Sequence, residues 1–189
     1  GFIVLLLSVI IIFYKTLNHT SKEVIKNLKN KAERDEMLNI YNRTKLMNKL
    51  QGEIKRANRY ENDLSLIMFD VDYFKEINDK NGHLVGDNIL ISIINIVKNE
   101  IREVDFLARY GGDEFIIINP ETSKEEAAKL AERLRSEIEI SEFEKIKNVT
   151  CSFGVAELKE DDDIDSFIKR VDDALYEAKE RGRNKVIKG

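Results

Sequence analysis

The sequence predicts an α+β fold: a mixed central β-sheet with a glycine hairpin, flanked by helices and preceded by an N-terminal helix. Three observations favour this class. The run Leu64 to Phe69 is apolar on both faces apart from Ser65, as in a strand buried on two sides. Gly111 and Gly112 separate two strand-like runs and indicate a tight hairpin, because the favoured hairpin turns need positive φ. The segments follow one another as β-α-α-β-β-α-β-α-β, without an internal repeat.

Composition limits the classes of function. The 189 residues allow one ordinary domain plus an appendage. A net charge of -4 argues against a general nucleic-acid binder, although not against a nucleotide ligand. With one cysteine and two histidines, neither an internal disulfide nor a zinc site is expected, so any metal would have oxygen ligands. Cys151 lies in an apolar run and is expected to be a buried structural thiol.

The N-terminal residues predict a membrane connection. Phe2 to Tyr14 is apolar apart from Ser8, but it is shorter than the roughly 20 residues that span a bilayer. Because the chain opens on Gly1, we expect residues 1–14 to be the truncated end of a transmembrane helix. A signal-peptide core is the competing interpretation, but a basic n-region and a cleavage site are missing.

A basic linker, residues 15–34, follows the apolar run. Basic residues beside a membrane segment place that side in the cytoplasm, which predicts an inner-membrane protein with residues 35–189 as a cytoplasmic domain. Ser21 to Met37 has the pattern of a helix. Its narrow apolar stripe of Ile25, Leu28 and Ala32 fits half of a parallel coiled coil or a solvated linker helix equally well.

Helices and strands then alternate. Thr44 is predicted to cap a helix that carries Met47, Leu50, Ile54 and Ala57 on one face. After the Leu64 strand, Tyr73 to Asn78 begins a helix, and a second helix follows Gly86-Asp87. A polar loop over residues 78–83 separates these two helices, and it contains a glycine suited to positive φ.

The second half repeats this alternation around the hairpin. The hairpin strands are predicted over Asp105–Tyr110 and Asp113–Asn119. Ser123-x-x-Glu126 is a capping box that opens the next helix. The remaining predictions are a strand over Val149–Ala156, a helix capped by Asp163 or Asp165, a helix end at Gly182, and a strand over Asn184–Ile187.

Carboxylates gather where two of these strands end. Asp70 and Asp72 follow the Leu64 strand, and period two places them on one face if the strand continues that far. If this strand lies beside the hairpin, Asp70 and Asp113 converge at one edge of the sheet. Carboxylates without a nearby histidine suit Mg²⁺, with Mn²⁺ as the alternative ion. Such ions neutralise a triphosphate and activate a hydroxyl for attack on phosphorus.

Basic residues accompany these acids. Lys75 follows Asp72 closely, and Lys179 and Arg183 are four residues apart at the end of the last helix, a spacing suited to one phosphate. Each residue also has a plainer interpretation. Asp72 would be a helix N-cap, Lys179 and Arg183 a solvated helix end, and the hairpin acids a soluble turn.

Several motifs together resemble one family. Gly111-Gly112-Asp113-Glu114-Phe115 carries the name motif of GGDEF domains, the catalytic modules of bacterial diguanylate cyclases. The chain is similar to this family from about residue 35 to residue 188. The other matching segments are Asp70-Val71-Asp72-Tyr73-Phe74-Lys75-Glu76-Ile77-Asn78-Asp79, Gly82-His83-x-x-Gly86-Asp87, Asp173-Ala174-Leu175-Tyr176-x-Ala178-Lys179 and Gly182-Arg183-Asn184-Lys185-Val186.

The resemblance implies a nucleotidyl-cyclase or palm-like fold and a specific reaction. Such domains condense two GTP into cyclic di-GMP and release two pyrophosphates, with one GTP on each subunit of a homodimer. By analogy, Asp70, Asp113 and the carbonyl of Val71 hold Mg²⁺, and Glu114 supports them in catalysis. The implied substrate-binding residues are Tyr73, Phe74, Lys75, Asn78, Asp87, Gly111, Gly112, Lys179 and Arg183.

The resemblance also implies an inhibitory product site. Arg102 and Asp105 match the R-x-x-D pattern at which cyclic di-GMP binds such domains, and Arg133 is a candidate third member. A surface ion pair is the alternative interpretation of this pattern. One departure concerns the leading motif D-x-L-T-G-L-x-N-R, in which Leu38-Asn39 replaces the usual Thr-Gly pair. This departure affects the coupling of the preceding helix, not the catalytic residues.

Three functions remain to be compared. The leading hypothesis is an active, product-inhibited diguanylate cyclase driven by a membrane-linked input. The runner-up is a catalytically silent domain that acts as a receptor for GTP or cyclic di-GMP; the retained acids and glycines argue against it. A relative that makes mixed cyclic dinucleotides is the third, and Asp87 argues against it because its acceptor is suited to guanine.

Overall fold

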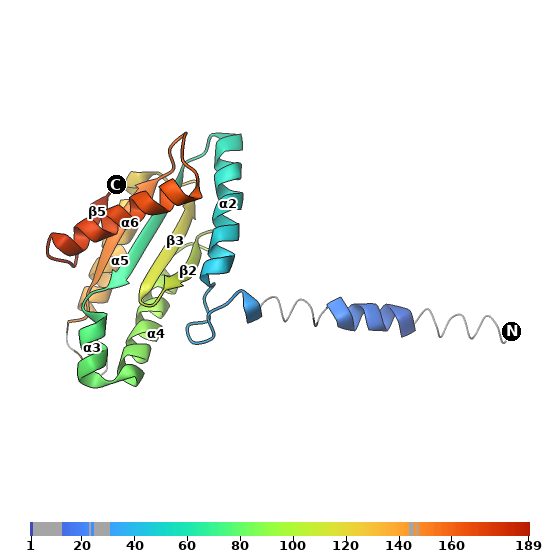
Figure 1. The fold of residues 1–189 in the computed structure, drawn as a ribbon, viewed down its shortest axis with the longest axis horizontal. Coiled ribbons are helices and arrows are strands. Elements are labelled where there is room, and N and C mark those ends of the chain that lie inside the picture. Colours follow the sequence, from blue (N-terminus) through green and yellow to red (C-terminus); the bar gives the residue numbers. More distant parts are fainter. Residues whose placement is uncertain (2–12, 23, 25–30, 144–145, 147) are drawn as a thin grey trace. The chain divides into compact units, whose positions relative to one another are not determined.

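The computed structural model, drawn in Figure 1, describes residues 1, 13–22, 24, 31–143, 146 and 148–189. The chain separates into two compact units, residues 1–34 and 35–189. In the first unit, residues 13–22 are helical. The helix predicted over Ser21–Met37 is wrong at its C-terminal end, because residues 33–37 are not helical.

Two predictions for the first unit fall on residues that the structure does not describe. Ile25 and Leu28 of the predicted apolar stripe are such residues, and so is most of the apolar run Phe2–Tyr14. Among the residues that are described, we find no helix with the length and apolar character that crossing a bilayer requires.

The second unit contains the predicted mixed sheet. Its five strands lie in the order β2-β3-β1-β4-β5, and all neighbours are antiparallel except the parallel pair β4 and β5. The observed bounds are β1 Leu64–Val71, β2 Phe106–Gly111, β3 Glu114–Pro120, β4 Cys151–Glu157 and β5 Val186–Lys188. The predicted sequence of helices and strands and the α+β class are therefore confirmed.

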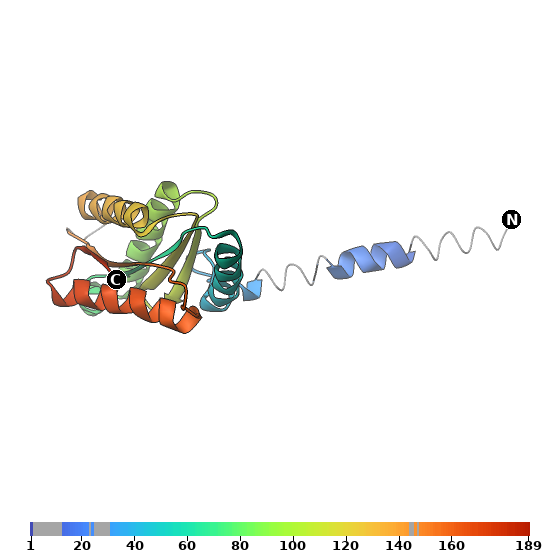
Figure 2. The same cartoon turned by 90° about the horizontal axis from the view of Figure 1, so that it is seen from above.

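Helices cover both faces of this sheet. Figure 2 shows α2 and α6 on one face and α4 and α5 on the other, and the two core clusters divide in the same way. The helices are α2 Arg43–Tyr60, α3 Phe74–Asn81, α4 His83–Glu100, α5 Lys124–Ile140 and α6 Ile164–Glu180. The sheet is thus the middle layer of three.

Strand β1 is central because both of its faces are apolar. All eight of its residues are buried. Leu64, Leu66 and Met68 belong to the core cluster of α2 and α6, whereas Ile67, Phe69 and Val71 belong to that of α4 and α5. Phe69 stacks between Phe115 and Phe153, with ring centroids 5.1 and 5.3 Å away. Burial of such a side chain contributes about 1.5–3 kcal/mol, so these rings fix β1 between β3 and β4.

The capping signals are mostly confirmed. Ser123 and Asp163 each form a capping box at the start of α5 and α6. The predicted cap of α2 is wrong: the N-cap is Asn42, whose side-chain oxygen accepts a hydrogen bond from Lys45 N at 3.1 Å. Asn and Thr both cap helices, so the residue type did not separate the two positions.

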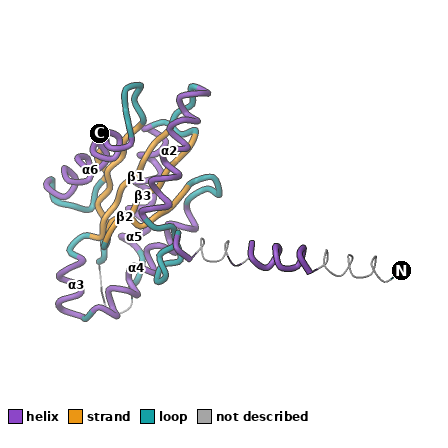
Figure 3. Tube along the Cα trace, turned by 45° about the vertical axis from the view of Figure 1, so that its right-hand side comes forward, coloured by secondary structure: helices purple, strands orange, loops and turns teal. Residues whose placement is uncertain are grey.

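The turn between α3 and α4 is shorter than predicted. Helix α3 continues to Asn81 and α4 already begins at His83, so only Gly82, with φ of +86°, separates them. Gly86 lies inside α4 rather than before it. Figure 3 shows α3 and the start of α4 beyond the end of the sheet at which β1 finishes. The residues after β1 therefore lie at the same end of the sheet as this helix pair.

Candidate active site

The acidic centre of the site is built by the pairing of β1 with β3. Asp70 lies directly opposite Glu114 in this antiparallel pair. Directly opposed residues project to the same face of a sheet. For this pair it is the face of α2 and α6, because Asp70 alternates with Phe69 and Val71 of the opposite core. Asp113 precedes Glu114 in the hairpin turn, so the predicted convergence of Asp70 with the hairpin acids is observed.

Asp70 occupies an electrostatically unbalanced position. Its Oδ2 lies 3.1 Å from Lys179 Nζ on α6. Burial and the neighbouring Asp113 nevertheless outweigh this ammonium and raise the pKa of Asp70 to about 7. Burial also raises the pKa of Glu114 above its usual range. One further positive charge beside Asp70 and Asp113 would favour the ionised state of both.

This donor set fits a hard divalent cation. Its protein ligands would be carboxylate and carbonyl oxygens, which Mg²⁺ and Mn²⁺ accept. No group of three or more histidine, cysteine, aspartate or glutamate side chains is arranged to hold a metal among the residues that the structure describes. The two aspartates and the Val71 carbonyl would therefore share the ion with phosphate oxygens of a ligand, as is common for Mg²⁺.

Lys179 and Arg183 are positioned at the site by different structures. Lys179 is in the last turn of α6, but the helix ends at Glu180. Arg183 is beyond it, with φ of +62°, so the two cations do not share a turn of the helix. The Arg183 guanidinium instead lies over the ring of Tyr73, with 4.5 Å from Cζ to the ring centroid. The site therefore keeps both cations, through a turn rather than a helix.

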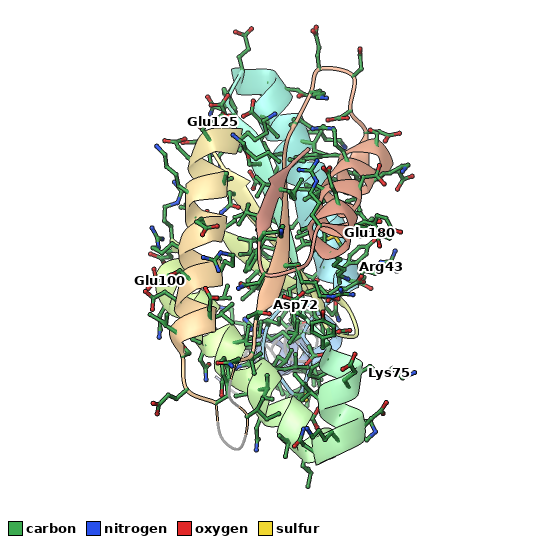
Figure 4. The ribbon with its side chains drawn as sticks, turned by 90° about the vertical axis from the view of Figure 1, so that its left-hand side faces the viewer. Arg43, Asp72, Lys75, Glu100, Glu125 and Glu180 are labelled. Carbon is green, nitrogen blue, oxygen red and sulfur yellow. The ribbon has the colours of Figure 1, made fainter. Side chains whose placement is uncertain are left out.

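Asp72 does not have the N-cap role that its position suggested. It is not the N-cap of α3; that position is held by Tyr73, which has φ of +57° and makes no side-chain capping bond. Asp72 accepts hydrogen bonds from the hydroxyls of Thr150 and Ser152, both at 2.7 Å, and it is 3% exposed. Figure 4 shows Asp72 between α3 and the end of the sheet, with Lys75 on the outer side of α3.

The α3–α4 pair brings Asn78 against Gly86. The Asn78 Oδ1 atom is buried and has no hydrogen-bond partner among the described residues. A Cβ atom on Gly86 would lie 2.0 Å from this oxygen, so only glycine leaves room for the amide. Asp87 is half-buried beside Gly86. A buried amide without a partner indicates a ligand or a water at this position.

The glycines at the hairpin tip are exposed, and Arg109 holds their backbone in place. Gly111 and Gly112 are exposed, Gly112 has φ of +45°, and no atom approaches within 4 Å of a Cβ placed on either residue. Arg109 Nε donates to the Gly112 carbonyl at 2.7 Å, and Arg109 Nη1 pairs with Asp35 at 2.8 Å. Burial favours a raised pKa for Asp35, but the hydrogen bonds from Arg109 and Leu38 lower it.

The unusual Leu38-Asn39 pair is compatible with the leading turn. Asn39 has φ of +49°, a left-handed conformation that asparagine tolerates better than most residues. Its backbone N–H donates to the Asp35 carbonyl at 3.0 Å, and Leu38 is buried in the core. The substitution of the usual glycine by Asn39 therefore preserves a turn.

The R-x-x-D segment forms a closed ion pair at the start of β2. Arg102 Nη2 and Nε donate to the two carboxylate oxygens of Asp105 at 2.9 and 3.3 Å. The Asp105 side chain is fully buried, whereas that of Arg102 is 53% exposed. This hydrogen bond raises the pKa of Arg102. Arg102 also donates to Thr122 Oγ1 at 2.6 Å. The segment is thus an ordered ion pair in which the guanidinium of Arg102 stays partly exposed.

Two further predicted residues have internal roles. Arg133 on α5 pairs with Glu100 at 2.6 Å, so its guanidinium has a partner within the chain. Cys151 is fully buried, and burial raises the pKa of its thiol well above the usual value. The prediction of a structural thiol is consistent with this environment.

Two arginines near the hairpin, Arg43 and Arg109, had no predicted role. Arg43 lies over the ring of Tyr110 at 4.5 Å, and its charge counteracts the raised pKa of Glu114. Arg109 clamps the hairpin tip. Both residues stand inside motifs that the sequence shows, so their positions were visible, but their partners are distant in sequence.

Comparison with known proteins matches this site to one family. Residues 32–185 match the family described as diguanylate cyclase, GGDEF domain. The chain is 36% identical over 165 residues to the diguanylate cyclase DgcP of Pseudomonas aeruginosa, covering 86% of this chain and 25% of that protein. It is 40% identical over 156 residues to the diguanylate cyclase DosC of Escherichia coli, covering 80% and 34%. The chain thus spans about a quarter to a third of these relatives.

Solved structures agree with the fold. The coiled coil and GGDEF domain of DgcB from Caulobacter crescentus, in complex with c-di-GMP, has a TM-score of 0.88 and 26% identity, covering 97% of this chain and 99% of that chain. The active GGEEF domain of a diguanylate cyclase from Vibrio cholerae has a TM-score of 0.75 and 38% identity, covering 78% and 96%.

Proposed function

This chain belongs to the GGDEF-domain family of diguanylate cyclases, and we propose that it condenses two GTP into cyclic di-GMP and two pyrophosphates. The observation that carries the proposal is the position of Asp70. It is a buried carboxylate beside Asp113, with a pKa raised to about 7, at the edge of the sheet where Lys179 also arrives. Such a centre is suited to a cation and a polyphosphate rather than to structural stability.

Residues around the acidic centre divide the tasks of binding GTP. Lys75, Lys179 and Arg183 supply positive charge for the triphosphate. Asn78 offers a buried amide oxygen without a partner, which supports hydrogen bonding to the guanine edge, and Asp87 can accept from the guanine N–H groups. The exposed Gly111 and Gly112 leave room for the ribose and the α-phosphate against the backbone.

In the reaction, a ribose 3′-hydroxyl of one GTP attacks the α-phosphorus of the other. A phosphorus–oxygen bond forms, the bond to pyrophosphate breaks, and the hydroxyl gives up its proton. We assign Glu114 as the group that accepts this proton, because it lies opposite Asp70 and is not one of the residues that would hold the metal. When bound at Asp70, Val71 and Asp113, Mg²⁺ or Mn²⁺ would supply positive charge to the triphosphate and to the attacking hydroxyl. Because each copy holds one GTP, both bonds need two copies: the same attack in the opposite direction closes the ring, releases the second pyrophosphate and frees a second proton.

The proposal includes product binding at Arg102. The exposed face of its guanidinium is suited to a phosphate or a guanine, and the buried Asp105 holds it in place. Arg133 would join this site by exchanging Glu100 for the product. Product binding there would lower turnover.

The proposal is tested by turnover of Mg²⁺-GTP with the 189-residue chain, with the product identified by mass. We expect cyclic di-GMP from the parent and none from Asp113→Ala, because that variant loses a metal-binding carboxylate. A folded, dimeric parent that makes no cyclic dinucleotide would contradict the enzyme. Binding of cyclic di-GMP that is lost in Arg102→Ala would then identify a receptor.

A further inference from the structure

The turn that carries Arg183 is backbone-strained and held from two sides. Gly182, Arg183 and Asn184 are three successive residues with positive φ, at +103°, +62° and +46°. For residues other than glycine, this region is sparsely populated and persists only where the surroundings enforce it. The residues that enforce the turn therefore decide where the Arg183 guanidinium lies.

One side of this support is Asp72. Its Oδ2 accepts a hydrogen bond from the backbone N–H of Asn184 at 3.1 Å. Thr150 and Ser152 on the neighbouring chain segment fix the carboxylate, and the backbone N–H of Asp72 donates to the Thr150 carbonyl at 2.9 Å. Because these bonds use both oxygens and Asp72 is 3% exposed, this carboxylate is a fixed acceptor rather than a mobile surface acid.

The other side of the support is α5. Asn184 Oδ1 accepts from Arg135 Nη1 at 2.9 Å, and Asn184 Nδ2 donates to Glu139 at 2.7 Å. Arg135 also pairs with Glu132 and Glu139, so its guanidinium is anchored to the helix. The backbone and the side chain of Asn184 are thus held by different elements.

Arg183 directly precedes Asn184, so the supports of Asn184 also position Arg183. Arg183 lies over Tyr73, which directly follows Asp72. Within the described part of the chain, no ion pair joins Arg183 to a carboxylate, so its charge is available to a ligand. Asp72 is therefore linked to Arg183 in two ways. It directly precedes Tyr73, whose ring lies under the guanidinium, and it accepts a hydrogen bond from Asn184, the residue after Arg183.

We propose that Asp72 is a positioning residue that fixes Arg183 against Tyr73 through Asn184 and so shapes the triphosphate side of the site. This inference rests on the proposed function and deepens it. Asp72 does not touch the substrate. Its contribution is to keep the turn after α6 in the one conformation that places Arg183 beside the β1–α3 junction.

A double-mutant cycle tests this role. With Mg²⁺ and 3′-deoxy-GTP, which lacks the attacking hydroxyl, we expect Asp72→Ala and Arg183→Ala each to weaken binding about tenfold, the loss of one charge-assisted contact. The double variant is expected to bind no more weakly than Arg183→Ala alone, because both changes remove the same contact. GMP, which lacks the β- and γ-phosphates, is expected to bind all four proteins alike. Additive losses, or an equal loss for GMP, would overturn the proposal.

Conservative variants separate positioning from folding. Asp72→Asn is expected to restore most of the affinity, since its amide oxygen can accept from Asn184 and the Ser152 hydroxyl can accept from its amide. Asp163→Ala, which removes a distant helix cap, controls for lost stability and is expected to leave affinity unchanged. If Asp72→Ala does not fold, Asn184→Ala tests the same turn at a half-buried position and is likewise expected to be non-additive with Arg183→Ala.

A measurement without GTP keeps the two proposals distinct. Stacking on Tyr73 shifts the NMR signals of the Arg183 side chain by ring currents. We expect this shift in the parent and in Asp72→Asn, and its loss in Asp72→Ala or Asn184→Ala. An unchanged shift in both alanine variants would refute the positioning role. A parent that shows the shift but binds no GTP would refute the proposed function alone.

Discussion

Two buried aspartates at opposite ends of the sheet have opposite environments. Asp105 is bound by the guanidinium and the backbone N–H of Arg102, so its charge is balanced within the chain. Asp70 has one lysine on one side and another carboxylate on the other, and its pKa rises to about 7. The first arrangement stabilises the fold. The second is electrostatically incomplete without a ligand, which is the expected trade-off between stability and activity at a functional site.

The sharpest test of this contrast is the pH dependence of stability without metal. Because the folded-state pKa of Asp70 is raised, the unfolded state releases its proton first, and the free energy of unfolding falls as the pH rises from about 4 to about 7. The loss is expected to reach about 4 kcal/mol and to stay constant above this range. We expect Asp70→Asn to remove most of it and to be more stable than the parent at pH 8, while losing turnover.

Urea unfolding in a chelator at pH 5 and pH 8 measures this effect. Asp163→Asn is the matched control, because hydrogen bonds from Ser166 lower the pKa of Asp163 and its contribution changes only below this pH range. Equal pH dependence in the parent and in Asp70→Asn would show that Asp70 is not the strained group.

The second prediction concerns the balanced pair. Asp105→Ala is expected to lower the free energy of unfolding by about 2–3 kcal/mol, because the buried acceptor of three hydrogen bonds is lost. Glu100→Ala, which breaks the more exposed pair with Arg133, is expected to cost under about 1 kcal/mol. Below the unfolding temperature, the initial turnover number of Asp105→Ala, measured before product accumulates, is expected to match the parent. A large loss of turnover by a fully folded Asp105→Ala would erase the distinction between the two regions.

The smallest predicted effect tests the proposed recognition of guanine by Asn78. A Cβ on Gly86 would displace the Asn78 amide, so Gly86→Ala is expected to weaken GTP binding about tenfold, or about 1.4 kcal/mol. Its thermal stability is expected to change little, since alanine favours the helix. Gly52→Ala in α2, where a new Cβ meets nothing within 4 Å, is the matched helical control. Calorimetry that gave both variants parental affinity would exclude Asn78 from recognition.

The sequence predicted what periodicity and turn chemistry encode. The two apolar faces of β1 gave its central position, and Ser123-x-x-Glu126 located the start of α5 because the cap is local in sequence. The convergence of Asp70 with the hairpin acids needed only the assumption that β1 lies beside the hairpin, which the register confirms.

The features that the sequence did not predict depend on tertiary contacts. The four-residue spacing suggested that Lys179 and Arg183 reach one phosphate from the end of α6. However, α6 ends between them, and Asp72 and Arg135 hold the next residue, Asn184. Gly86 suggested a helix start, whereas it is an interior position that makes room for Asn78. The partners of Asp72 are more than 75 residues away, so no local pattern could reveal them.

The strand order limits how two copies can meet. One outer strand, β2, is bridged at Ala108 by Tyr41, whose carbonyl accepts from Arg109 N at 2.8 Å. The other, β5, is only three residues long, and Gly189 N after it donates to the Val155 carbonyl at 2.8 Å. Blunted edges of this kind disfavour edge-to-edge polymerisation. If two copies pair as the proposed reaction requires, we therefore expect them to meet through helices and loops rather than through strand edges.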